Sequence, residues 1–422
     1  MTLSRFNSII SASFFSIPLL FLSIWNPRAV YSGDWPGHLG PNRNGVASSD
    51  EKVAQQLDVA PQVDWTIPAG MGYAGASISD NQVCLFDHLD QQERLRLVSL
   101  DKGSLIWEKR YPSTYRGGMD SDHGPRCVPT ILQEAIVLYS AAGELTLVNR
   151  RDGATIWTRA LRKEYGADDG YFGAGSTPLV IADLIVVNVG SKNGGVVAVS
   201  IEDGKDVWKT DNSEASYASP IFLTIKGKSR VLVPTRLKTI LLDPTDGKVL
   251  SEIRFGARGP SVVAATPIPI DAERIFLTSS YGVGTLVVDS QSDRLIEVLR
   301  NGLMNSQYAT PVVSDGRLFG SDGREDSGGG AYLCVDTQDF EPIWSEPNMP
   351  ISHSIRVGNS VLVVGIDGRI WAIEGNATQW EPKWNIALPK GNYRPLPAFS
   401  QGLLVTRNTG PQSKWIAIRI DR

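Results

Sequence analysis

The stretch from Ser176 to Asp211, STPLVIADLIVVNVGSKNGGVVAVSIEDGKDVWKTD, decides the fold of this chain. It contains three short apolar runs rich in β-branched residues, a tight-turn sequence at 202–205 and a last short run that ends at Trp208. Such runs, separated by turn residues, predict four antiparallel strands. One small sheet cannot bury both of its faces, so it needs copies of itself on either side.

The copies recur along the chain at the spacing of β-propeller blades. Aligned on the turn and on the residue four places after its glycine, successive copies end 50, 51, 43, 46 and 47 residues apart. One propeller blade takes roughly 40 to 50 residues. The copies end at Trp107, Trp157, Trp208, Ser251, Glu297 and Trp344, and a seventh copy with a longer turn ends at Trp384.

The eighth copy is divided between distant parts of the sequence. Residues 395–420 supply three strands without a fourth, and the run around Trp65 supplies one strand without companions. Joining them closes the ring and removes the exposed sheet edges that an open array would leave. The sequence therefore predicts an all-β, eight-bladed β-propeller over residues 63–422, made of four-stranded antiparallel blades, in which an N-terminal strand completes the last blade.

Composition agrees with a single large domain. The 422 residues are 42% hydrophobic and include 41 Gly and 25 Pro, which is typical of a globular, turn-rich chain. The net charge of −4 provides no basic footprint, so nucleic acid is excluded as a partner. We expect a monomer.

The first 32 residues differ from the rest. Arg5 precedes an uncharged apolar stretch from Ile9 to Trp25, and small residues follow up to Ser32. This pattern predicts a secretory signal peptide cleaved after about Ser32. The alternative, a permanent membrane anchor, is disfavoured because serines and Pro18 interrupt the short run. We expect a periplasmic or secreted protein without a membrane span or lipidation cysteine, in which residues 33–62 form an arm on the propeller surface anchored by Trp35.

Cysteine and histidine give no metal site. Cys84, Cys127 and Cys334 lie in strand runs of different blades, where small buried hydrophobic residues are expected. The four histidines lack any metal-ligand spacing. The pairs Asp120/Asp122 and Asp168/Asp169 offer oxygen ligands for calcium but lack the spacing of a dedicated calcium loop, so solvated turns are favoured.

The repeat tails resemble the β-propeller repeat of the pyrroloquinoline-quinone (PQQ) proteins, with near matches at 243–248 and 200–208. At larger scale the chain is similar to the PQQ-like propellers of planctomycete-type bacteria, often described as BamB-like or alcohol-dehydrogenase-like. The strings that carry this resemblance lie at 34–46, 122–130, 173–180, 216–221 and 281–284.

The resemblance implies that one tryptophan of each blade docks against the neighbouring blade. The residues placed to do so are Trp65, Trp107, Trp157, Trp208, Trp344 and Trp384. Ser251 and Glu297 replace the tryptophan in blades four and five, which we expect to be the loosest. Two further departures concern function: the chain has no lipidation cysteine like that of BamB and no vicinal cysteine pair like that of quinoprotein alcohol dehydrogenases.

Loop lengths indicate which face of the ring binds. In such blades, the loops between the second and third strands and those between blades open on one face. These loops are long and chemically mixed, at 111–126, 162–175, 255–263, 300–308, 321–330 and 390–394, whereas loops on the opposite face are tight turns. Long, mixed loops carried on a rigid scaffold are typical of a binding surface.

Residues just before each innermost strand, with those of the second-to-third loops, are expected at the mouth of the central channel. They are Asp122, His123, Arg126, Tyr171, Phe172, Lys192, Asn193, Tyr217, Arg258, Tyr281, Gln307, Tyr308, Asp326 and His353. A ring of Arg, Lys, His and Tyr suits an anionic or carbonyl-rich ligand. The alternative is that these residues merely solvate and cap the channel. His123, flanked by Asp120 and Asp122, is a candidate for a general base.

Two functional classes remain open. In the favoured one, the protein is an exported non-catalytic propeller whose long-loop face is a platform for another envelope protein, a peptide or a glycan. In the other, it is a quinoprotein dehydrogenase that oxidises an alcohol or sugar with PQQ and calcium.

Overall fold

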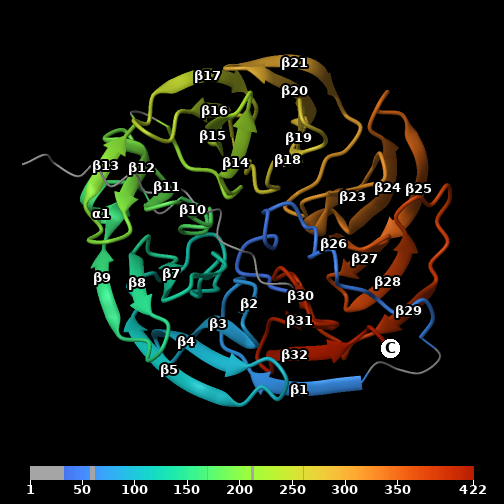
Figure 1. Ribbon diagram of the computed structural model, residues 1–422, viewed down its shortest axis with the longest axis horizontal. Helices are drawn as coiled ribbons and strands as arrows, with labels where there is room; N and C mark the ends of the chain where they lie inside the picture. Colours follow the sequence, from blue (N-terminus) through green and yellow to red (C-terminus); the bar gives the residue numbers. More distant parts are fainter. Residues whose placement is uncertain (1–32, 58–61, 169, 211–212, 260) are drawn as a thin grey trace, which may run out of the picture.

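The computed structural model describes residues 33–57, 62–168, 170–210, 213–259 and 261–422, and these form a closed ring of eight sheets around a central axis (Figure 1). Each sheet contains four antiparallel strands. The predicted eight-bladed β-propeller is therefore confirmed. The predicted signal peptide lies outside the described residues. Within the ranges given, no helix is long and apolar enough to cross a membrane.

We number the blades in chain order. Blade 1 contains β2 Ser77–Ser79, β3 Gln82–Leu89, β4 Gln92–Ser99 and β5 Leu105–Pro112, and blade 2 contains β6 Thr130–Ile131, β7 Ala135–Tyr139, β8 Leu145–Asn149 and β9 Thr155–Arg159. Blade 3 contains β10 Leu179–Ile181, β11 Leu184–Ser191, β12 Gly194–Ser200 and β13 Asp206–Lys209, and blade 4 contains β14 Ile221–Ile225, β15 Lys228–Pro234, β16 Lys238–Leu242 and β17 Val249–Arg254.

Blades 5 to 8 follow the same order. Blade 5 contains β18 Ile268–Pro269, β19 Arg274–Ser279, β20 Gly284–Ser292 and β21 Arg294–Asn301, and blade 6 contains β22 Val312–Ser314, β23 Arg317–Arg324, β24 Gly329–Asp336 and β25 Pro342–Met349. Blade 7 contains β26 Ser352–Val357, β27 Ser360–Gly365, β28 Arg369–Glu374 and β29 Trp384–Ala387, and blade 8 contains β30 Ala398–Ser400, β31 Leu403–Arg407, β32 Lys414–Arg419 and β1 Gln62–Pro68. Two short helical turns, α1 Leu161–Tyr165 and η1 Glu325–Ser327, lie in connections.

The middle strands of each blade are buried on both faces because a neighbouring blade packs on each side. Strands β11 and β12 are buried almost throughout, whereas the outer strand β17 has no fully buried residue. Ile185 and Val187 of blade 3 pack in one cluster with Leu145 and Leu147 of blade 2. Near-continuous β-branched runs are expected for strands covered on both faces. The core is thus distributed between blades.

Each of the six tryptophans predicted to dock donates its indole N–H to a backbone carbonyl beyond its own blade, over 2.7–3.1 Å. The pairs are Trp65 with Leu100, Trp107 with Arg150, Trp157 with Ile201, Trp208 with Pro244, Trp344 with Ala377 and Trp384 with Ala54. Five of these carbonyls lie in the loop between the third and fourth strands of the next blade. The repeated turn therefore serves as the receptor for the neighbouring indole.

The glycine of the turn is required by this contact. Gly247 has φ +70°, and a Cβ at this position would lie 2.4 Å from the ring of Trp208. The turn is also held by its aspartate, because Asp243 accepts hydrogen bonds from the backbone N–H of Thr245. A side chain at Gly247 would both strain the backbone and displace the indole.

Ser251 and Glu297, which stand where other blades have a docking tryptophan, make different contacts. The hydroxyl oxygen of Ser251 accepts a hydrogen bond of 3.0 Å from the backbone N–H of Leu295 in blade 5. Glu297 instead pairs with Arg300 of its own strand at 2.9 Å. The joint between blades 4 and 5 thus keeps a polar link without the buried ring.

Blade 8 is completed as the sequence predicts. Strand β1 pairs with β32 in antiparallel register, with Trp65 opposite Ala417 and Ile67 opposite Trp415. On the neighbouring blade, buried Asp87 accepts hydrogen bonds of 2.8 Å from both Arg94 and Arg96, and one of 3.0 Å from the backbone of Gly70 just after β1. The buried carboxylate of Asp87 therefore lies next to the β1–β32 pairing that closes the ring.

The arm supplies the turn that this divided blade lacks. No loop joins β32 to β1, so Trp384 of blade 7 has no turn carbonyl to bond to in blade 8. The carbonyl of Ala54 accepts this indole N–H at 2.8 Å, and the N–H of Ala54 donates to Ile420 at 2.8 Å. Glu51 also accepts backbone hydrogen bonds from Gln401 and Gly402. The arm therefore replaces the turn that joins the third and fourth strands in the other blades.

Earlier residues of the arm cross the centre of the ring (Figure 1). Trp35 is 2% exposed and forms an antiparallel bridge with Ile78 of β2. His38 lies 2.9 Å from the hydroxyl of Thr266, and the guanidinium of Arg43 donates to the carbonyls of Thr177 and Pro178. Since the arm also contacts the turn after β2, it fills the end of the channel on the short-turn side.

We expect Trp208→Ala to destabilise the fold by about 3–5 kcal/mol, because it empties a buried dock between blades 3 and 4. Val207→Ala, on the adjacent and half-exposed residue of β13, is the matched control and should cost far less. Chemical denaturation monitored by fluorescence measures both. An unchanged transition in the tryptophan variant would contradict the docking role.

Candidate functional site

The long-loop face is built from the connections between blades and from the second-to-third loops, as predicted from loop lengths. Its longest segments run at 113–129, 160–178 and 255–267. One predicted loop is shorter than expected: residues 321–324 continue β23 and 329–330 begin β24, so only 325–328 form the turn. The hairpin is longer because Asp322, Gly323 and Arg324 continue the strand pairing, opposite Ala331, Gly330 and Gly329.

A central pocket of about 150 Å³ opens on this face at the ring axis. Its walls come from the residues before the inner strands, and His38 of the arm contributes to it from the other end of the channel. The lining includes His38, Tyr73, Asp120, Arg126, Phe172, Tyr217, Tyr281, Gln307, Tyr308, His353 and Arg394. The pocket is therefore aromatic and closed below by the arm.

The cations of the central pocket are already engaged. Arg126 bonds to the carboxylate of Asp122 at 3.3 Å and lies 5.2 Å from the ring of Tyr115. Arg394 lies over the rings of Tyr73 and Tyr308, at 4.5 and 4.8 Å from their centroids. These aromatic contacts and ion pairs leave little free positive charge for a ligand.

The histidines of the pocket are neutral. Burial is the main cause that lowers the pKa of His353 to about 4, and Nε2 of this ring lies 2.8 Å from the carbonyl oxygen of Arg394. Nε2 must carry the proton to donate to that carbonyl, which leaves Nδ1 without a partner among the described residues. Burial also lowers the pKa of His38 well below its usual range.

The central pocket does not fit PQQ. PQQ is a planar, carboxylate-rich quinone, whereas the central pocket of about 150 Å³ is smaller than the roughly 300 Å³ at which organic-ligand pockets begin. Across the described residues, no group of three His, Cys, Asp or Glu side chains is placed to hold a metal ion.

His123 lies beside the central pocket and does not line it. Its ring stands edge-on to His88, with centroids 5.9 Å apart. Asp120 accepts from the hydroxyl of Tyr73 at 2.7 Å, and Asp122 accepts from the backbone of Gly72 and Gly124 at 2.8 Å. Within the described structure, neither carboxylate hydrogen-bonds to the His123 ring, and a general-base role for His123 stays a prediction from the sequence.

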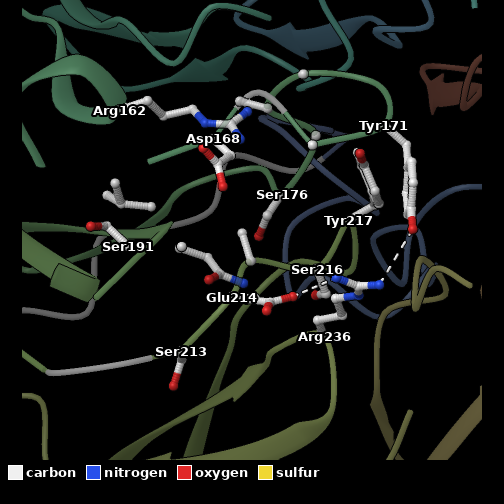
Figure 2. Close-up of a pocket in the computed structure, with 18 of the residues that line it drawn as sticks. Arg162, Asp168, Tyr171, Ser176, Ser191, Ser213, Glu214, Ser216, Tyr217 and Arg236 are labelled. Atoms are coloured by element: carbon white, nitrogen blue, oxygen red, sulfur yellow. Dashed lines mark hydrogen bonds and ion pairs between the residues drawn. The ribbon is translucent and has the colours of Figure 1, made fainter. Parts of the chain in front are cut away.

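A second, larger pocket of about 570 Å³ lies between blades 3 and 4 on the same face (Figure 2). Tyr217 lines both pockets, and its hydroxyl oxygen accepts a hydrogen bond from the backbone of Phe172 at 2.9 Å. The larger pocket has a mixed lining whose polar side chains include Arg162, Asp168, Tyr171, Asn188, Lys192, Asn193, Glu214 and Arg236. Its volume is within the range of small-molecule sites.

The cations of this pocket differ in their partners. Arg236 pairs with Glu214 at 2.6 Å (Figure 2) and donates to the carbonyl of Gly259 at 2.9 Å. Arg162 is 7% exposed and has no ion pair or side-chain hydrogen bond to any described residue. Lys192 is exposed at the rim. One buried guanidinium of the pocket is therefore uncompensated.

The structure distributes the predicted mouth residues over three locations. Arg126, Phe172, Tyr217, Tyr281, Gln307, Tyr308 and His353 line the central pocket; Tyr171, Lys192, Asn193 and again Tyr217 line the pocket between blades 3 and 4; Asp122, His123, Arg258 and Asp326 line neither. Arg258 is exposed, and Asp326 is exposed and paired with Arg324. The expected single funnel is thus two adjoining pockets.

The lining residues that were not predicted include four with basic side chains, His38, Arg162, Arg236 and Arg394. Arg162 and Arg394 stand at the first and last positions of two loops that the sequence marks as long, which is a signal that could have found them. Arg236 lies in a short loop and His38 in the arm, and neither position has a distinctive local pattern.

The ring of four-stranded blades and the docking tryptophans define this molecule as an eight-bladed propeller of the PQQ-like class. Residues 91–346, more than half of the chain, match the family model described as outer membrane protein assembly factor BamB. The chain belongs to this family, which confirms the resemblance seen in its repeats.

Solved structures agree on the fold. BamB from Moraxella catarrhalis is similar over 86% of this chain and 98% of its own, with a TM-score of 0.61 and 14% identity. A quinohemoprotein alcohol dehydrogenase from Pseudomonas putida HK5 is similar over 92% and 80%, with a TM-score of 0.65 and 11% identity. The computationally designed protein Ika8 matches over 87% and 99%, with a TM-score of 0.57 and 11% identity. At these identities the likeness concerns the fold alone. A comparison with curated proteins gives no match.

We expect acid to destabilise the fold through His353. Its pKa of about 4 in the folded state lies below that of an unfolded histidine, so the unfolded chain binds the proton more readily between pH 6.5 and 4. Stability should fall by up to about 3 kcal/mol as the pH drops through this window. His353→Gln should show a correspondingly smaller loss than the unaltered chain when denaturation is followed at a series of pH values. Equal slopes for the two proteins would contradict the assignment.

Proposed function

We propose that the protein is an exported, non-catalytic propeller whose long-loop face binds a polypeptide segment of another envelope protein. The observation that carries this proposal is the difference between the two faces of the ring. The long-loop face has two adjoining pockets, of about 570 and 150 Å³, whereas the arm fills the channel at the other end. A binding function needs such an open, chemically varied surface on a rigid support.

Membership of a family described by an assembly factor of the outer membrane supports an envelope location and a protein partner. The similarity to BamB from Moraxella catarrhalis over nearly the whole length of that protein adds to this support. The cations of the central pocket already have partners and its volume is small, and both features disfavour the second class, a PQQ-dependent dehydrogenase. The propeller fold itself is shared with quinohemoprotein alcohol dehydrogenases.

Site-specific photo-crosslinking in intact cells tests the proposed face. Lys192 and Lys205 are both exposed and belong to blade 3, but they lie on the long-loop face and in a short turn of the opposite face, respectively. A photoreactive amino acid at Lys192 should give a discrete protease-sensitive adduct that is absent when the same amino acid replaces Lys205. Adducts from Lys205 alone, or protease-resistant adducts that indicate a glycan, would overturn the proposal.

The dehydrogenase alternative has a direct test. Purified protein is incubated with PQQ and calcium, desalted, and assayed for quinone absorbance and for dye reduction with alcohols. We expect no retained absorbance. Retained cofactor together with alcohol-dependent dye reduction would establish the alternative and refute a non-catalytic function.

A further inference from the structure

The pocket between blades 3 and 4 contains a buried positive charge that the protein does not neutralise. Arg162 is 7% exposed, its Nε has no hydrogen-bond partner, and its guanidinium forms no ion pair with any residue that the structure describes. An ion removed from water without a partner is costly, so buried charges are normally paired or coordinated. Elsewhere in this fold, buried Arg94 and Arg96 follow that rule by sharing Asp87.

The chain holds Arg162 in this position. Arg162 lies in α1, the short turn that leads from blade 2 towards blade 3, and its backbone N–H donates to Gly143 at 3.3 Å. Its aliphatic stem packs on Gly143, where an added Cβ would lie 2.2 Å from the stem. Gly143 therefore leaves the space that the stem occupies, and the guanidinium is directed towards Gly170 at the pocket wall.

Other polar groups of the pocket complement an anionic organic ligand. Asn188 is 3% exposed; its amide N–H bonds to Pro234 at 2.9 Å, whereas its side-chain oxygen has no partner among the described residues. Lys192 adds a second cation at the rim, and Arg236 is already neutralised by Glu214. The exposed carboxylate of Asp168 opposes an anion, so the preference rests on Arg162 and Lys192 together.

We propose that the pocket between blades 3 and 4 binds the carboxylate or phosphate group of an organic ligand on the guanidinium of Arg162. A planar guanidinium suits either oxyanion because two N–H groups donate in parallel. The volume of about 570 Å³ exceeds the needs of a single ion, so the oxyanion belongs to a larger molecule whose hydroxyl or amino group can donate to Asn188. This inference refines the proposed function, on which it rests, by naming the chemistry recognised at that face.

Isothermal titration calorimetry at low ionic strength tests the proposal with four probes. They are inorganic phosphate, succinate, a short peptide with a free C-terminal carboxylate, and the same peptide with an amidated C-terminus. At least one oxyanion probe should bind. Binding of phosphate alone identifies a phosphate group, binding of succinate identifies a small carboxylate, and preference for the free over the amidated peptide identifies a chain terminus.

Variants of the pocket decide whether Arg162 is responsible. Arg162→Gln should weaken binding roughly 10- to 100-fold, as expected for the loss of one charge-assisted contact, and Arg162→Lys should retain part of the affinity. Asp168→Asn should strengthen binding, a change that a merely structural role of the pocket would not produce. Lys163→Gln, which removes the same charge from the exposed adjacent residue outside the pocket, is the matched control and should bind like the unaltered chain.

Two results would overturn the inference: no probe binding more tightly than about 10 mM, or equal affinity in the Arg162→Gln and unaltered proteins. Because these titrations use no partner protein, they are independent of the crosslinking result. Crosslinks from Lys192 without oxyanion binding would refute this inference alone, and oxyanion binding without such crosslinks would refute the polypeptide partner alone.

Discussion

The indole hydrogen bond that docks one blade on its neighbour, made at six of the eight joints of the described ring, is the contact on which the rest of this structure most depends. No blade has a core of its own: strands such as β11 and β12 are buried only because neighbours cover both faces. The indole of Trp208 fills the gap between two blades, and the glycine and aspartate of the receiving turn give it a flat surface and a fixed carbonyl. Each blade therefore depends on its neighbours for burial, and closure of the ring gives every blade a neighbour on both sides. This explains why the arm reproduces a turn carbonyl at Ala54, where the divided blade has none.

Most of the fold was predictable because its determinants are local and repeated. Apolar runs of strand length and turns with glycine at a fixed offset mark each blade, and the unpaired run around Trp65 has only one strand, β32, left to join. The path of the arm was not predictable. His38 and Arg43 make their contacts with residues more than a hundred positions away, and nothing in their local sequence indicates those partners.

The same distinction applies to the candidate site. Tyr217, Gln307 and Tyr308 line a pocket because they precede inner strands, a position that follows from the repeat. Whether an arginine on such a face is exposed, paired or buried alone depends on the side chains around it. Arg258, Arg236 and Arg162 illustrate these three outcomes in turn, and the sequence does not distinguish them. The sequence repeat thus locates the binding face, whereas the chemistry of that face depends on residues that are not part of the repeated pattern.

The pairing of β1 with β32 also constrains how the molecule is made. Trp65 leaves the ribosome long before Ala417, its partner across the ladder, has been synthesised. Until then the first blade presents an uncovered side, and β1 is a strand with free backbone groups, the kind of element that associates with other chains. A protein of this design needs either rapid completion of synthesis or a chaperone that shields β1 during that interval.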